Sequence, residues 1–103
     1  MLTVKAAYLI MREFLEEYYC LTGSFDVGAL LGDTMLLEDG STADPAAWED
    51  WLQAIKSAEI SLIDDTYMSE VDAYKTIVAF LRGYGYRIHS KEIFRLIKEM
   101  NEE

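Results

Sequence analysis

Residues 3–31 read TVKAAYLIMREFLEEYYCLTGSFDVGALL, and residues 69–97 read SEVDAYKTIVAFLRGYGYRIHSKEIFRLI. An ungapped offset of 66 residues aligns seven identical residues, which are Ala7, Tyr8, Phe14, Leu15, Tyr18, Ser24 and Leu30 in the first copy and Ala73, Tyr74, Phe80, Leu81, Tyr84, Ser90 and Leu96 in the second. Further pairs are similar in kind, such as Asp26 with Glu92. Because this register preserves both polar helix starts and both apolar stripes, we interpret the two segments as an internal repeat.

Each copy has the pattern of a helical hairpin. In the first copy, Thr3 is a candidate N-cap, and apolar residues then recur at helical spacing to Tyr18 before Gly23 ends the helix. Ser24 is the candidate N-cap of a shorter helix that ends at Gly32. The second copy predicts a helix from about residue 69 to 84, a turn that uses Gly83 and Gly85, and a helix over residues 90–100. Two copies are too few for an open solenoid, so we expect them to pack face to face.

A different pattern separates the copies. Asp44-Pro45 predicts a helix start, and the apolar face of Trp48, Trp51, Leu52, Ile55 and Ala58 predicts a central helix to about Ser57. Before it, Met35-Leu36-Leu37 predicts a buried anchor followed by an exposed acidic loop. The conformation of residues 59–67 stays open between an extended piece and a frayed helix end.

These patterns predict one all-α domain over residues 1–103, a compact bundle of about five to seven helices. Its parts are a hairpin over residues 3–31, an acidic loop and central helix over residues 32–67, and a hairpin over residues 68–100. A chain of 103 residues with 51% hydrophobic residues supplies enough apolar surface for one core.

The net charge of -10 is concentrated in the middle of the chain. Residues 1–32 sum to -2, residues 33–65 to -8 and residues 66–103 to zero. A negative field of this kind repels nucleic acid and anionic membranes, and it attracts a basic protein partner. The candidate interface residues are eight of the nine acids of this region: Asp33, Glu38, Asp39, Asp44, Glu49, Asp50, Asp64 and Asp65.

Some of these acids have a structural alternative. Asp44 is a helix cap, and Glu49 and Asp50 lie near the positive end of the helix dipole. Asp33, Glu38, Asp39, Asp64 and Asp65 have no such role in the sequence pattern. A solvated surface and a binding surface therefore remain equally open for the group as a whole.

Motifs for catalysis, metals and cofactors are missing from the sequence. A calcium loop that begins at Asp33 meets Met35 at its third position, and one that begins at Asp39 has Asp44 where glycine is required. His89 precedes the Ser90 cap and is expected to be a turn residue. Cys20 is expected to be a buried thiol in a reducing compartment. We expect no enzyme activity, no cofactor, no metal and, because no leader or membrane span is predicted, a cytoplasmic protein.

Three strings resemble a known group of proteins: FLEEYY at residues 14–19, LLGD at residues 30–33 and DPAAWEDWL at residues 44–52. They are similar to the small all-helical immunity proteins of bacterial contact-dependent growth inhibition and related polymorphic toxin systems. The resemblance implies a cytosolic protein that forms a 1:1 complex with the C-terminal toxin domain of a large secreted effector. It further implies a ribonuclease-type partner whose active site is covered. Such proteins diverge at the toxin-facing surface, so the resemblance assigns no contact residues.

Three functions follow as hypotheses. The first is an immunity protein whose middle third, residues 33–65, faces a basic, nuclease-type toxin domain. The second is a metal-dependent enzyme that uses carboxylates, and the third is a helical module that self-associates through its apolar stripes. Neither nucleic acid nor a membrane is an expected partner.

Overall fold

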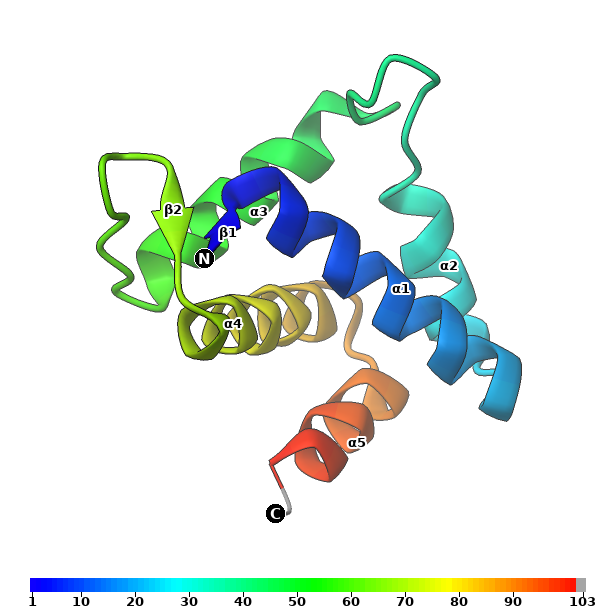
Figure 1. Ribbon diagram of the computed structural model, residues 1–103. Helices are drawn as coiled ribbons and strands as arrows, with labels where there is room; N and C mark the ends of the chain where they lie inside the picture. The colour runs from blue at the N-terminus through cyan, green and yellow to red at the C-terminus, as the bar shows by residue number, and fades with distance from the viewer. Residues whose placement is uncertain (102–103) are drawn as a thin grey trace.

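Figure 1 shows the computed structural model, which describes residues 1–101. Within that range the chain forms five α-helices: α1 Val4–Thr22, α2 Phe25–Asp33, α3 Pro45–Ser57, α4 Glu70–Ile88 and α5 Lys91–Met100. Two short strands, β1 Leu2–Thr3 and β2 Tyr67–Met68, pair antiparallel. The predicted all-α domain is confirmed, with α1–α2 as the first hairpin, α4–α5 as the second hairpin and α3 between them.

Side-chain caps start all five helices at the predicted residues. The cap oxygen accepts a backbone N–H two or three residues along the chain in each case. The caps are Thr3 to Ala6 at 3.0 Å, Ser24 to Val27 at 3.4 Å, Asp44 to Ala46 at 2.9 Å, Ser69 to Asp72 at 3.1 Å and Ser90 to Ile93 at 3.0 Å. The polar residues in front of each apolar stripe therefore determine where the helices begin.

The predicted turn at Gly83 and Gly85 is wrong. Both glycines lie inside α4, which continues to Ile88 and ends at His89 in the left-handed conformation, with φ 54°. Gly23 ends α1 in the same way with φ 63°, so the two copies match here as well. Gly85 is required for packing, because a Cβ at this position would lie 3.1 Å from Ile93 Cγ2 of α5. His89 is a turn residue, as predicted.

The two hairpins contact each other through equivalent residues. Leu2 pairs with Met68, its counterpart at the 66-residue offset. The Ser24 hydroxyl donates to Glu92 at 2.5 Å, and the Ser90 hydroxyl donates to Asp26 at 2.5 Å. Since Asp26 and Glu92 are also counterparts, these contacts are reciprocal, as in the isologous interface of a symmetric dimer. The closed, face-to-face arrangement of the copies follows from them.

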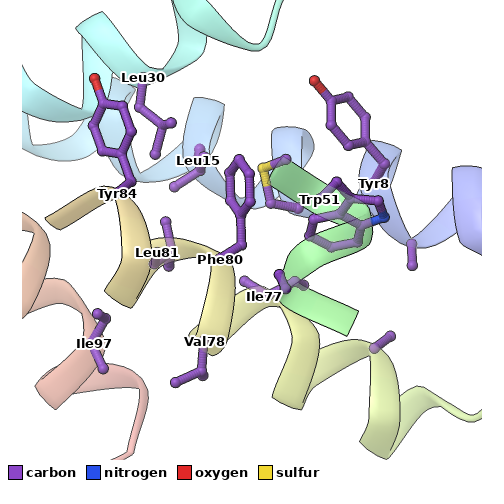
Figure 2. Packing of buried hydrophobic residues seen from close by; sticks show 14 of the residues in the cluster. Tyr8, Leu15, Leu30, Trp51, Ile77, Val78, Phe80, Leu81, Tyr84 and Ile97 are labelled. Atoms are coloured by element: carbon purple, nitrogen blue, oxygen red, sulfur yellow. The ribbon is translucent and has the colours of Figure 1, made fainter. Parts of the chain in front are cut away.

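Trp51 of α3 lies in the centre of the core, between the two hairpins (Figure 2). Its ring makes edge contacts with Tyr8 of α1 at 5.6 Å and with Phe80 of α4 at 5.5 Å between centroids. Its indole N–H donates to the backbone oxygen of Val4 at 3.1 Å. The central helix is therefore part of the core that joins the two copies.

Three predictions about burial are corrected by the structure. Cys20 is exposed, because it lies on the side of α1 opposite the buried stripe of Tyr8, Met11 and Leu15. Leu52 is exposed at the edge of the α3 apolar face. In the expected apolar anchor only Leu36 packs against the core, whereas Met35 and Leu37 are exposed.

The connections on either side of α3 are irregular. Before α3, the buried Thr34 holds the chain to the first hairpin, since Tyr8 donates its hydroxyl to the Thr34 backbone oxygen at 2.8 Å. After α3, residues 60–66 form neither a helix nor a regular strand. A single bridge between Ile63 and Tyr67 closes a turn that contains Asp64 and Asp65, both with positive φ.

Ser90→Ala is expected to lower the free energy of unfolding by about 2 kcal/mol, because it removes a helix cap and leaves the Asp26 carboxylate without its hydroxyl donor. The matched control is Ser69→Ala, which removes a cap of the same type without a contact between the hairpins and is expected to cost about 1 kcal/mol. Urea denaturation measures both values. Equal losses would show that the contact between the hairpins adds no stability.

Gly83→Ala is expected to raise the free energy of unfolding by about 0.5–1 kcal/mol, because Gly83 is exposed inside α4 and an added Cβ meets no atom within 4 Å. Gly85→Ala is expected to lower it, because the added Cβ would lie 3.1 Å from the fully buried Ile93 and 3.3 Å from the Phe94 ring, and both would have to shift. Thermal and urea unfolding of the two variants compare them directly. A stabilising Gly85→Ala would refute the close packing of α4 on α5.

Candidate interaction surface

The structure divides the predicted acidic residues into two groups. Six acids lie at the end of α2, on the α2–α3 connection and in the first turns of α3, and we call them the acidic surface: Asp33, Glu38, Asp39, Asp44, Glu49 and Asp50. Asp64 and Asp65 lie in the turn beyond the other end of α3 (Figure 1). A helix of 13 residues is roughly 20 Å long, so the two groups do not form one continuous site.

Two members of the acidic surface contact the second hairpin. Asp50 pairs with Arg87 at 3.0 Å, and Asp33 accepts a hydrogen bond from the Tyr84 hydroxyl at 3.1 Å. Together with Asp44, these side chains line a cleft of about 210 Å³ between α2, α3 and α4. Asp33 and Asp50 therefore have a structural role that sequence spacing did not reveal, since their partners lie 51 and 37 residues away along the chain.

The environment of Tyr84 favours its neutral form. Burial raises the pKa of the Tyr84 phenol to about 12, and the hydrogen bond to Asp33 and the charge of this carboxylate act in the same direction. The Arg87 guanidinium, 5.5 Å from the centroid of the Tyr84 ring, opposes the shift. The phenol is thus a hydrogen-bond donor that holds the end of α2 against α4.

Of the remaining acids, Glu49 lines a second, larger hollow. A groove of about 540 Å³ lies between the start of α1, the loop before α3 and the first turns of α3, and it is lined by Lys5, Tyr8, Leu36, Gly40, Ser41, Thr42, Pro45, Trp48 and Glu49. Trp48 is half-buried there, with its ring 5.5 Å from that of Tyr8. The sequence pattern placed Trp48 in the core, yet a half-buried tryptophan in a groove is also typical of a binding surface.

The loop next to this groove is shaped by Asp39. Its carboxylate accepts hydrogen bonds from the Ser41 backbone N–H at 2.9 Å and the Ser41 hydroxyl at 2.6 Å. These bonds lower the pKa of Asp39, and the positive charge of Lys5 adds to the effect. The Lys5 ammonium lies against Gly40, and a side chain at position 40 would displace it.

Most of the acidic surface makes no salt bridge within residues 1–101. Among residues 1–101, salt bridges within 4.0 Å join only Arg12 to Glu16 and Arg87 to Asp50. Glu38, Asp39, Asp44 and Glu49 are exposed and make no such pair in that part of the chain. Their side chains are therefore available to cations on a partner.

Two other properties limit the chemistry of the described chain. No group of three or more His, Cys, Asp or Glu side chains within residues 1–101 is arranged to hold a metal ion. Over the same residues, none of the helices combines the length and the apolar character needed to span a bilayer.

Comparisons with protein-family models, with curated proteins and with solved structures found no match.

Tyr84→Phe is expected to reduce the loss of stability above pH 10. An unfolded tyrosine has a pKa of about 10. The folded protein, with the Tyr84 pKa at about 12, retains a proton that the unfolded chain releases, so the contribution of Tyr84 is complete below pH 10 and is lost as the pH rises to 12. Urea unfolding of both proteins across this range measures the difference, and identical pH profiles would contradict the raised pKa of the buried Tyr84 phenol.

Proposed function

We propose that this chain is an immunity-type inhibitor that binds a basic, nuclease-type toxin domain and covers its active site. The proposal combines the resemblance of residues 14–19, 30–33 and 44–52 to immunity proteins with the charge of the acidic surface. The observation that carries it is the cluster of Glu38, Asp39, Asp44 and Glu49, exposed and without salt bridges within residues 1–101.

Electrostatics explains how such a surface inhibits a nuclease. A nuclease binds the phosphates of its substrate with lysine and arginine side chains, which present a positive surface around the active site. Carboxylates on the inhibitor occupy the same positions and increase the association rate by steering. Inhibition then needs no chemical step, because the bound inhibitor excludes the nucleic acid sterically.

The arrangement of the helices suits rigid presentation of these charges. The acidic loop is anchored at one end by Thr34, at the other by the Asp44 cap, and between them by the bridge from Leu36 to Thr42. Asp39 orders the tip of the loop through Ser41. A surface that is ordered before binding loses little conformational entropy on association.

The proposal predicts that the gene immediately upstream encodes a large secreted protein, and the direct test uses the toxin domain at the C-terminus of that protein. Co-expression of the present chain is expected to restore growth of cells that produce this domain, and the two purified proteins are expected to form a 1:1 complex. No rescue and no complex would refute the proposal. Calorimetric titration of the chain alone with Mg²⁺, Ca²⁺ and Mn²⁺ separates it from the carboxylate enzyme, which requires binding heat.

Neutralising the loop charges with Glu38→Gln and Asp39→Asn is expected to slow association with the toxin domain, most strongly at low salt. Asn at position 39 retains an oxygen acceptor for Ser41, so the loop keeps its shape. Reversing both residues to lysine enlarges the effect in the same direction. Stopped-flow mixing at several salt concentrations measures the association rate.

The matched control is Asp64→Asn with Asp65→Asn, which removes the same amount of charge at the other end of α3. Asn tolerates the positive φ of 51° and 55° at these positions, so the turn is preserved. We expect this variant to associate faster than the loop variant. Equal rates for the two variants would mean that net charge, rather than the acidic surface, controls association.

A further inference from the structure

The tip of the first hairpin exposes large apolar side chains to solvent. Leu21 near the end of α1 is 79% exposed, and Phe25 at the start of α2 is 81% exposed. No other large apolar side chain within residues 1–101 is as exposed as these two. Leu21 is in the last turn of α1 and Phe25 is the first residue of α2, so they flank the short turn of Gly23 and Ser24 that links the two helices (Figure 1).

The internal repeat shows that the fold does not require apolar residues here. At the 66-residue offset, Leu21 corresponds to Arg87 and Phe25 to Lys91, both of which are exposed. Ala29, one turn after Phe25, corresponds to the exposed Arg95. These exposed positions are thus basic in the second hairpin, where Arg87 pairs with Asp50, and apolar in the first, where Leu21 and Phe25 face solvent. The hairpin fold therefore does not require apolar side chains at these positions.

These apolar residues also surround a hollow. Tyr19, Phe25, Gly28, Ala29 and Leu31 line a depression of about 300 Å³ with no charged side chain in its wall. The Tyr19 ring covers Gly28 so closely that an added Cβ would lie 2.8 Å from Tyr19 Cε1. We call Tyr19, Leu21, Phe25, Gly28, Ala29 and Leu31 the apolar patch.

The repeat explains how the depression in the first hairpin forms. In the second hairpin the aromatic ring comes from the other helix, because Phe94 of α5 lies over Gly85 of α4. In the first hairpin the aromatic ring belongs to α1, and Gly28 and Ala29 leave the outer face of α2 without large side chains. The result is a flat apolar helix face bordered by two aromatic rings, which suits an inserted side chain.

Charge distinguishes between the partners that this patch can accept. Glu17, one turn before Leu21, and Asp33, one turn after Ala29, are its exposed charged neighbours along α1 and α2, and both are acidic. A second copy of a chain with net charge -10 would bring like charges together around the patch. A partner protein with an apolar side chain inside a basic surface is complementary to the apolar centre of the patch and to its acidic rim.

The apolar patch and the acidic surface are close enough for one partner protein to contact both. Phe25 and Asp33 are the first and last residues of α2, whose nine residues span roughly 14 Å. A protein interface of ordinary size covers about 800 Å² on each partner, which is enough to include both ends of this helix. The exposed residues Phe25, Ala29, Gly32 and Asp33 connect the two areas along α2.

We propose that the apolar patch is the anchor site for an apolar side chain of the same basic toxin domain, an inference that rests on the proposed function. In this division of roles, the acidic surface accelerates association and the apolar patch slows dissociation. Desolvated apolar anchors dominate complex lifetimes, whereas exposed charges act mainly on association rates. The inserted side chain fills the depression between Tyr19 and Phe25.

The test replaces Leu21 with Arg and Phe25 with Lys, which are the residues that the second hairpin carries at the equivalent positions. The repeat indicates that this variant folds, and circular dichroism with urea unfolding verifies it. Surface plasmon resonance with the immobilised upstream toxin domain measures both rate constants. We expect dissociation to accelerate at least about tenfold. Because the two added positive charges also oppose a basic partner, association is expected to slow by about as much as in the Glu38→Gln, Asp39→Asn variant.

A matched control is Leu9→Lys, which also introduces the residue of the second hairpin, Lys75, at an exposed apolar position on α1. Because Leu9 is 42% exposed and lies three turns away from Leu21, this change is expected to leave the dissociation rate within about twofold. Equal acceleration in the control would overturn the assignment of the anchor to the apolar patch.

The outcomes separate the two proposals. If the unaltered chain binds and the Leu21→Arg, Phe25→Lys variant dissociates at the same rate, the anchor site is wrong and the proposed function stands. If the unaltered chain does not bind the toxin domain, the proposed function fails and the anchor site fails with it. If sedimentation shows that the chain alone is a dimer that the variant separates, a second copy occupies the patch and the anchor proposal is overturned.

Discussion

The position of Trp51 between the two hairpins is the interaction on which the rest of the structure depends. Its ring contacts Tyr8 of the first hairpin and Phe80 of the second, and its N–H satisfies the Val4 carbonyl. Because this tryptophan belongs to α3, its burial holds the central helix inside the core and thereby determines where the loops on both sides of α3 emerge. The acidic loop and the groove beside Trp48 are consequences of that burial. Loss of the ring would open a large cavity at the one place where all three parts of the fold meet.

The two hairpins share a scaffold and differ in their surfaces. Their caps, buried stripes and reciprocal serine–carboxylate contacts are equivalent. A residue in the left-handed conformation ends both α1 and α4. Three exposed positions at the hairpin tip, in contrast, are apolar in the first hairpin and basic in the second: Leu21, Phe25 and Ala29 correspond to Arg87, Lys91 and Arg95. The internal repeat therefore acts as a built-in comparison that separates the side chains needed for folding from the side chains available for binding. Both the apolar patch and the acidic surface lie on or next to α2, whereas α5 carries mixed charges.

The candidate site was predictable in part. Charge counting along the chain located the acidic residues of the α2–α3 connection, and the Asp44 cap was predictable because its hydrogen bond is local. The structural partners of Asp33 and Asp50 were not predictable, because Tyr84 and Arg87 are distant in sequence and come near only when α4 packs beside α2 and α3. Asp64 and Asp65 were grouped with the others by sequence proximity, but α3 separates them in space. The groove at Trp48 was missed because helical periodicity gives the direction of a side chain and not the depth of its burial.

By itself, the sequence determined the helix starts, the repeat, the class of fold and the concentration of negative charge, because caps, periodicity and composition act over a few residues. The end of α4 was predicted wrongly, as a turn at Gly83 and Gly85. The repeat aligns His89 with Gly23, the residue that ends α1, and this alignment indicates the correct helix end. Only the tertiary structure decided which acids are compensated, that Cys20 is exposed and that Gly28 lies beneath the Tyr19 ring. The physical reason is that burial and ion pairing depend on contacts between elements far apart in the chain, which local patterns do not encode.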